Sequence, residues 1–287
     1  MNGQSPFREG RGRKSVDPTV LGPRQPEPPK PHRFPKAAGA DPARIQQRNP
    51  MYRQPAVLNG NRHREWRLDL PEGDYGFAAG VNSLMVTGVE FALAAREYAI
   101  VFARGDAGQV VPVVMLGLSR GENLFLDGQG RWQGRYIPAY VRRYPFILAE
   151  DGDGKLAVCI DEASPAWNRE RGAALFGEGG EQSELLKSAV RFLSEFQAQY
   201  LKTERFINRL QEMDLLTEWA ARALLPSGEA LSLGGVLCVD EKKLLALPEQ
   251  EVLDLFRSGE MAWIYSHLTS LANLRELTLR KGCVSHG

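Results

Sequence analysis

The chain has 287 residues, of which 43% are hydrophobic, so it can bury a large core as one domain or two small ones. Its formal net charge of +1 is unevenly distributed along the chain. Residues 1–50 carry ten Lys or Arg and four acids, so residues 51–287 have a formal net charge of −5. A mildly acidic domain lacks the clustered positive charge that phosphate backbones require, so we expect no nucleic acid binding by the folded part.

Residues 1–50 form a basic tail that holds ten of the 18 prolines in the chain. Large apolar residues are rare there, so the tail buries too little surface to offset the entropy cost of ordering, and we predict it to be disordered. It has neither the apolar stretch of a secretory signal nor the amphipathic period of a transit peptide. A translation start at Met51 is an alternative that the composition leaves open.

The segment from residue 64 to about 161 is predicted to consist mostly of strands. Arg64 to Leu70 alternates polar and apolar residues, which is typical of a half-buried strand. Thr87 followed by Glu90 matches a capping box, which predicts a helix that runs to about Tyr98.

Three β-hairpins are predicted between residues 99 and 160. The first joins residues 99–104 to 110–118, and the third joins 146–149 to 155–160. In the second, Asn123 to Leu126 precede a tight turn at Asp127-Gly128. The Asp-x-Asp-Gly stretch at 151–154 resembles the start of a calcium loop, but a strand replaces the ligands that should follow. We therefore predict no metal site and no cofactor.

A helical period begins at Glu181 and continues to about Met213. One apolar stripe recurs at spacings of three, four or their sums, through Leu186, Val190, Leu193, Phe196, Tyr200, Ile207 and Leu210. Such a stripe predicts one long helix, at about 183–213, packed on a sheet.

The C-terminal part is predicted to contain a hairpin of residues 218–225 and 229–239, followed by helices. Asp240 is predicted to cap the first helix, Gly259 to end the second, and a last helix to run from Glu260 to about Arg280. Because hairpins outnumber βαβ units, we predict an α+β fold with a mainly antiparallel sheet, one long helix and a C-terminal helical pair. The expected organisation is a single domain at 51–281 with a flexible end at 282–287.

The longest nearly unbroken apolar run, Val110 to Leu118, has about half the length that a membrane-spanning helix requires. Cys159, Cys238 and Cys283 are odd in number and far apart, which favours reduced thiols over a disulfide framework. We therefore expect a cytoplasmic protein without a transmembrane segment, which would reach a cell surface only by a route independent of a signal peptide.

Residues 117–121 match G-x-S-x-G, the nucleophile elbow of α/β-hydrolases, with Ser119 at its centre. An elbow must lead into a helix, however, and the residues that follow predict a strand and a turn. The only histidine of the domain downstream is His267, in the middle of a predicted helix. A Ser119 hydrolase is therefore the less favoured alternative.

Other candidates for acid–base chemistry are few. The chain has four histidines, and two of them, His32 and His286, lie in the tail or at the C-terminus. The acidic pairs Asp161-Glu162 and Asp240-Glu241 are predicted to be solvated turns or caps, because neighbours on a strand or helix point apart.

The stretch from residue 121 to 146, which we call the aromatic segment, concentrates one Trp, three Tyr, two Phe and four Arg. Aromatic rings beside guanidinium groups often form recognition surfaces for planar or anionic ligands. Two interpretations stay open. The segment forms a binding pocket, or Arg142 and Arg143 pair internally with Glu122, Asp127 or Asp161 while the rings fill the core.

In this segment the sequence G-E-N-L-F-L-D-G, then W, then Y-I-P-A-Y-V-R-R-Y-P-F resembles the signature stretch of the bacterial SapC family. Further similarities lie at residues 62–64, 90–91, 99–102, 239–244 and 264–271. The resemblance covers residues 51 to about 280, which is nearly the entire predicted domain.

The resemblance implies an uncharacterised role rather than a known reaction. The family is named for its association with a paracrystalline surface layer, and its members are often encoded beside outer-membrane receptors and flavin-dependent halogenase-like proteins. We expect a non-catalytic accessory protein that binds a protein, peptide or surface-polysaccharide partner. The alternatives are an enzyme acting with a flavoprotein of the halogenase-like class and a subunit of a surface lattice. The candidate binding residues are Glu122, Asn123, Asp127, Trp132, Tyr136, Tyr140, Arg142, Arg143 and Tyr144.

Overall fold

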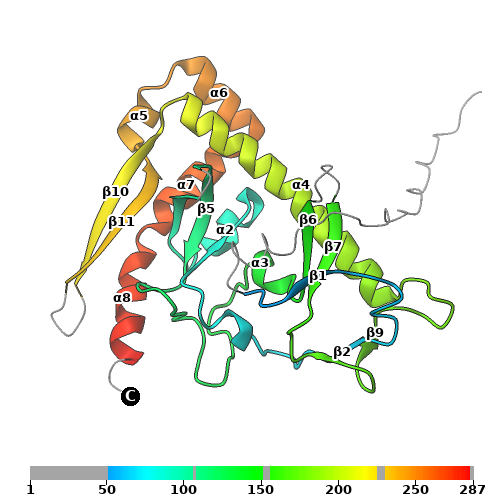
Figure 1. Ribbon diagram of the computed structural model, residues 1–287. Coiled ribbons are helices and arrows are strands. Elements are labelled where there is room, and N and C mark those ends of the chain that lie inside the picture. The colour runs from blue at the N-terminus through cyan, green and yellow to red at the C-terminus, as the bar shows by residue number, and fades with distance from the viewer. Residues whose placement is uncertain (1–50, 106–107, 151–155, 225–229, 285–287) are drawn as a thin grey trace, which may run out of the picture. The chain divides into compact units, whose positions relative to one another are not determined.

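A computed structural model describes residues 51–105, 108–150, 156–224 and 230–284 (Figure 1). The predicted tail, the possible calcium stretch and the turn centred on residue 227 lie outside the described residues. The described residues contain helices together with antiparallel sheets, so the predicted α+β class is confirmed.

The largest sheet has five strands in the order β10-β11-β4-β5-β3, and every neighbouring pair is antiparallel. The strands are β3 (Ser83–Met85), β4 (Ile100–Arg104), β5 (Val110–Met115), β10 (Leu216–Leu224) and β11 (Ala230–Val239). Successive residues of β4 are buried on opposite faces, with Ile100 and Phe102 in the main core and Val101 in a smaller cluster. The predicted hairpins β4–β5 and β10–β11 are both present.

A second sheet has the order β1-β7-β6, from β1 (Pro55–Val57), β6 (Phe146–Glu150) and β7 (Leu156–Asp161). A third sheet has the order β8-β2-β9, from β2 (Arg67–Leu68), β8 (Trp167–Asn168) and β9 (Ala173–Ala174). The predicted strand at 64–70 is therefore too long, since β2 comprises Arg67 and Leu68. Residues 60–65 form turns, in which the His63 amide donates to the Asn59 carbonyl at 2.9 Å.

The long helix α4 (Glu184–Glu212) confirms the predicted helix at about 183–213. Ser183 caps it, with its Oγ accepting a hydrogen bond from the Leu186 amide at 3.2 Å. The predicted apolar stripe of α4 faces inward, and its two halves pack against different sheets. Leu186 and Leu193 pack against the second sheet, whereas Ile207 and Leu210 lie in the main core with the five-stranded sheet. One helix thus buries apolar surface on two sheets, and Figure 1 shows α4 passing from β6 and β7 to β5.

Four helices follow β11 within the described residues: α5 (Glu241–Leu245), α6 (Glu249–Ser258), α7 (Glu260–Ser270) and α8 (Asn273–Val284). Asp240 caps α5, and Gly259 separates α6 from α7 with φ 79°, as predicted. The predicted single helix at 260–280 is wrong, because Ser270 Oγ bonds back to the His267 carbonyl at 2.6 Å and the chain turns before α8. Helix α8 continues to Val284, into the segment predicted to be a flexible end.

Two further local predictions need correction. Thr87 and Glu90 do form a capping box, but it opens a short 3₁₀ turn, η2 (Gly88–Glu90), and the four-residue helix α2 (Phe91–Ala94) rather than a helix to Tyr98.

The predicted hairpin at Asp127 is a closed turn with a single bridge between Leu126 and Trp132. The physical reason is that Asp127 Oδ1 accepts the amides of both Gln129 and Arg131, which folds the chain too tightly for paired strands.

Gly88 marks a close approach between η2 and two helices. Its amide donates to Thr203 Oγ1 of α4 at 2.8 Å, and a Cβ at this position would overlap the Trp263 ring of α7. We expect Gly88→Ala to lower the free energy of unfolding by about 1–3 kcal/mol, because the packed indole must move. Urea denaturation measures this change. Gly80→Ala is the matched control, since nothing lies within 4 Å of that position, and equal midpoints for the two variants would contradict the packing argument.

No helix within the described ranges is long and apolar enough to cross a membrane.

Candidate functional site

Two carboxylates beside helix α2 hold the aromatic segment in place. Glu90 is 4% exposed, and its Oε1 accepts the Tyr136 hydroxyl and the Ala139 amide, each at 2.8 Å. Glu97 accepts the amides of Arg135 and Tyr136, at 2.8 and 2.6 Å. The loop at 135–139 therefore takes its backbone geometry from carboxylates that lie about 40 residues earlier in the chain.

The aromatic side chains of the segment point mainly into the fold. Trp132 Nε1 donates to the Tyr98 hydroxyl at 2.8 Å, and that hydroxyl donates to the Tyr136 carbonyl. The Tyr140 ring packs edge to face on Phe196 of α4.

Tyr144 is buried at the far end of the segment. Its ring stacks on Phe77 at 3.9 Å between centroids, and its hydroxyl donates to Asp161 Oδ2 at 3.0 Å. Burial, followed by the Asp161 charge, raises the pKa of Tyr144 to about 12, although a hydrogen bond with Ser164 opposes the shift. Tyr144 therefore stays protonated at neutral pH and acts as a hydrogen-bond donor.

The three polar candidates shape turns. Glu122 Oε1 accepts the amides of Leu118 and Ser119, and its Oε2 binds Lys281 Nζ of α8. Burial raises the pKa of Glu122, but the Lys281 ammonium and the two amides outweigh it, so this pKa lies below its usual value.

Asn123 and Asp127 complete these turns. Asn123 accepts the Phe125 amide at 3.0 Å and donates to the Ala78 carbonyl at 3.1 Å. Besides the two amides that close its turn, Asp127 accepts the Gln133 side-chain amide at 3.0 Å. Both side chains therefore have structural partners.

The two arginine candidates behave differently, and neither forms an ion pair with a carboxylate of the described residues. Arg143 is 8% exposed, and its guanidinium carbon lies 3.7 Å from the Tyr140 ring centroid and 5.0 Å from that of Phe196. Arg142 is exposed, donates to the Ile137 carbonyl at 3.0 Å, and lies over the Phe192 ring. The expected pairing with Glu122, Asp127 or Asp161 is therefore wrong, because aromatic rings surround Arg143 and Arg142 turns to the surface.

A cleft of about 540 Å³ opens beside the aromatic segment, and we call it the arginine cleft. Three arginines from distant parts of the chain line it: Arg96 after α2, Arg135 in the segment, and Arg280 on α8. Leu93, Gln133 and Tyr136 form further parts of the wall, together with Glu97, Asn273 and Glu276. Tyr136 is the one predicted site residue that lines this cleft.

Helix α8 is fixed against the cleft at both ends. The Asn273 side chain donates to the carbonyls of Ala95 and Tyr98, at 2.7 and 3.0 Å. Near the other end, the Arg280 guanidinium lies 4.3 Å from the Phe125 ring centroid. Sequence reasoning missed Arg96 and Arg280, because a single exposed or half-buried arginine has no distinctive pattern until its spatial neighbours are known.

A second cleft, of about 390 Å³, lies beside the third sheet and is lined by Tyr144, Phe77, Asp74, Arg53 and Arg171, among others. Charges of both signs face it, and Arg171 lies 3.6 Å from Asp69. Its charges are partly balanced internally, so it indicates a ligand class less clearly than the arginine cleft does.

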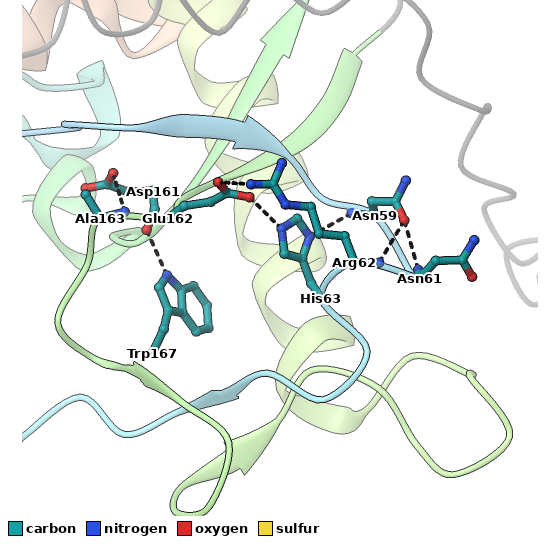
Figure 2. Close-up of polar contacts among 8 residues, drawn as sticks. All are labelled: Asn59, Asn61, Arg62, His63, Asp161, Glu162, Ala163 and Trp167. Carbon is teal, nitrogen blue, oxygen red and sulfur yellow. Dashed lines mark hydrogen bonds and ion pairs between the residues drawn. The ribbon is translucent and has the colours of Figure 1, made fainter.

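His63 forms a buried polar cluster at the end of β7 (Figure 2). The Asn59 amide donates to its Nδ1 at 3.0 Å, so Nε2 carries the proton and donates to Glu162 Oε1 at 2.8 Å. Arg62 binds the other oxygen of Glu162 at 2.6 Å. Both ring nitrogens are committed, so this imidazole joins the turn at 59–63 to β7 rather than offering a free base.

The prediction that Asp161 and Glu162 are solvated is wrong. Asp161 is fully buried and accepts the Gln54 amide at 2.7 Å, and the Glu162 side chain is 5% exposed. Figure 2 also shows the Trp167 indole donating to the Asp161 carbonyl at 2.8 Å. Neighbouring acids point apart as expected, but each meets its own set of donors inside the protein.

The geometry around Ser119 differs from that of a nucleophile elbow. The chain enters a turn rather than a helix, and the Ser119 amide is already bonded to Glu122 at 2.6 Å. His267 is fully buried, its Nδ1 donating to the Ile100 carbonyl and its Nε2 accepting the Val239 amide. The described residues therefore provide no serine–histidine pair of the required geometry.

The two cysteines whose side chains are described, Cys159 and Cys238, are free and buried. Burial raises the pKa of both thiols to about 12, so they stay protonated and unreactive at neutral pH.

Comparison with known proteins gives one result. A sequence model of the SapC family matches residues 58–277, which is most of the chain and includes the entire aromatic segment. No curated protein and no solved structure matches the chain significantly.

Proposed function

Because the chain belongs to the SapC family, we propose that it is a non-catalytic accessory protein that binds its partner in the arginine cleft. The observation that carries the proposal is an open cleft of about 540 Å³, bordered by the aromatic segment and lined by three arginines. The volume lies within the range of known small-ligand sites, although the lining is more polar than that of most such sites.

The role of the aromatic segment in this proposal is to position the cleft. Its rings are largely buried, while Gln133, Arg135 and Tyr136 border open space. A rigid hydrogen-bonded support is what a preorganised binding surface requires, since fewer side chains must be ordered when the partner arrives.

A binding role is also supported by the state of the residues that could act in catalysis. Both described histidines have two hydrogen-bonded ring nitrogens, and the buried carboxylates of Glu90 and Asp161 accept several donors each. A general base must be free to accept a proton from its substrate. We expect the partner to be a protein, a peptide or a surface polysaccharide of a cell-surface or outer-membrane receptor system, and the family resemblance supports this expectation.

Replacing Arg96 and Arg135 together by glutamine is expected to reduce partner capture roughly tenfold or more, because each charged hydrogen bond is worth about 1.5–3 kcal/mol. The measurement is quantitative mass spectrometry and sugar analysis of material retained from native cells by the tagged full-length chain. The control is Arg205→Gln with Arg257→Gln, two exposed arginines outside the cleft. Equal recovery of the same partner by both double variants would contradict the proposed site.

A further inference from the structure

We propose that the arginine cleft recognises an oxyanion, a carboxylate, phosphate or sulfate group of the partner, between the guanidinium groups of Arg96, Arg135 and Arg280. This inference rests on the proposed function for the existence of a partner, but the chemistry follows from the cleft itself. Arginine presents several N–H groups in a planar fork that matches the two oxygens of such a group.

The charge of the cleft favours an anion. Three arginines face two glutamates, Glu97 and Glu276, so the lining carries a formal charge of +1 within a domain whose residues 51–287 sum to −5. The two oxygens of Glu97 each accept a backbone amide. None of the three arginines forms an ion pair within 4.0 Å in the part of the chain that is described. Their charges are therefore not neutralised by a direct contact.

The guanidinium groups also belong to well-anchored elements. Arg280 lies over the Phe125 ring, and α8 is tied to α2 through Asn273. The backbone of Arg135 is anchored by its own amide, which donates to Glu97 at 2.8 Å. An anchored backbone leaves only side-chain rotamers to be ordered when an oxyanion arrives, which lowers the entropy cost of binding.

An apolar partner fits the cleft less well. Leu93, 44% exposed, and Tyr136 provide apolar contact, but charged and amide side chains make up most of the remaining lining. A partner without negative charge would leave three guanidinium groups desolvated without compensation. The ligand that offsets this cost carries acidic groups beside some apolar surface.

The test is titration of the full-length chain with three simple probes, inorganic phosphate, sulfate and acetate, followed by NMR of the arginine Nε–H groups. We expect saturable shifts of cleft arginines and at least a roughly tenfold weaker affinity in the Arg96→Gln, Arg135→Gln double variant. The matching lysine double variant should be intermediate, because lysine keeps the charge and loses the fork. Glu276→Gln should bind several-fold tighter, since it removes a competing carboxylate.

Three larger probes identify the source of the oxyanion: a glutamate-rich peptide, a phosphorylated peptide and a sulfated oligosaccharide. The one that binds most tightly, and loses affinity in the glutamine variant, names the class of partner. Equal binding by wild type and glutamine variant, or no binding of any probe, would overturn the inference.

The experiments can disprove the oxyanion inference and the proposed function independently of each other. If partner capture depends on Arg96 and Arg135 but no oxyanion binds, the oxyanion inference is wrong and the proposed site stands. If oxyanions bind in the cleft while capture is unaffected by its arginines, the proposed function is wrong instead.

Discussion

Glu90→Ala is expected to lower the free energy of unfolding by about 4 kcal/mol, a large loss for one residue. The carboxylate is nearly fully buried and accepts four hydrogen bonds. Its Oε2 takes the Thr87 amide and hydroxyl at 2.8 and 2.9 Å, and its Oε1 takes the Tyr136 hydroxyl and the Ala139 amide. Alanine would leave these donors without a partner in a place that water cannot readily reach.

Urea denaturation of three variants separates this explanation from a general effect of losing a charge. Glu90→Gln keeps the shape and one acceptor oxygen, so we expect roughly half of the loss. Glu195→Ala, at an exposed position on α4, should change stability by less than about 0.5 kcal/mol. A double-mutant cycle with Tyr136→Phe should show a coupling of about 1 kcal/mol, since the two side chains share a hydrogen bond. Similar midpoints for Glu90→Ala and Glu195→Ala would refute the structural role.

The fully buried His267 is expected to make stability depend on pH, with a loss of about 3 kcal/mol between pH 6.5 and pH 4. Burial lowers the pKa of this imidazole from 6.5 to about 4, and the hydrogen bond to the Ile100 carbonyl opposes the shift only in part. Below pH 6.5 the unfolded chain therefore binds a proton that the folded chain excludes. The contribution of the neutral His267 to the free energy of unfolding is complete above pH 6.5. On acidification from pH 6.5 to pH 4 it falls by about 1.4 kcal/mol per pH unit, and below pH 4 it no longer changes.

The matched variant is His267→Gln, which can accept the Val239 amide and donate to the Ile100 carbonyl without titrating. It should be less stable than the wild type at pH 7, yet its stability should fall less steeply on acidification. Denaturation at several pH values measures the difference in slope, and carboxylates that titrate in both proteins cancel in the comparison. Parallel curves would show that His267 is not the group responsible.

Local features of the fold could be predicted because each depends on residues close in sequence. The stripe from Leu186 to Leu210 predicted α4, and two runs rich in β-branched residues joined by a turn predicted the β4–β5 pair. Asp240 and Gly259 set helix boundaries through their own backbone and side-chain geometry. Predictions failed where a distant contact decided the outcome, as at Asp161 and Glu162, whose partners Gln54 and His63 lie about 100 residues earlier in the chain.

The candidate site also combines features that depend on local sequence with features that depend on the tertiary structure. The aromatic segment could be identified from composition alone, but composition left open whether it forms a binding surface or fills the core, because rings and arginines serve recognition and packing equally well. The structure places Tyr144 and Arg143 inside and leaves Arg135 at an open edge. Burial is a property of the assembled chain, so no count of aromatic residues could have separated these positions.

The sequence by itself determined the α+β class, the long helix α4, the hairpins β4–β5 and β10–β11, and membership of the SapC family, because these depend on local pattern and on a contiguous motif. Only the tertiary structure decided that Asp161 and Glu162 are buried, that both described histidines are committed, and that Arg96, Arg135 and Arg280 share one cleft. The reason is physical: a cleft is formed by residues that are remote in sequence, and the free energy that brings them together belongs to the core rather than to the residues that line it.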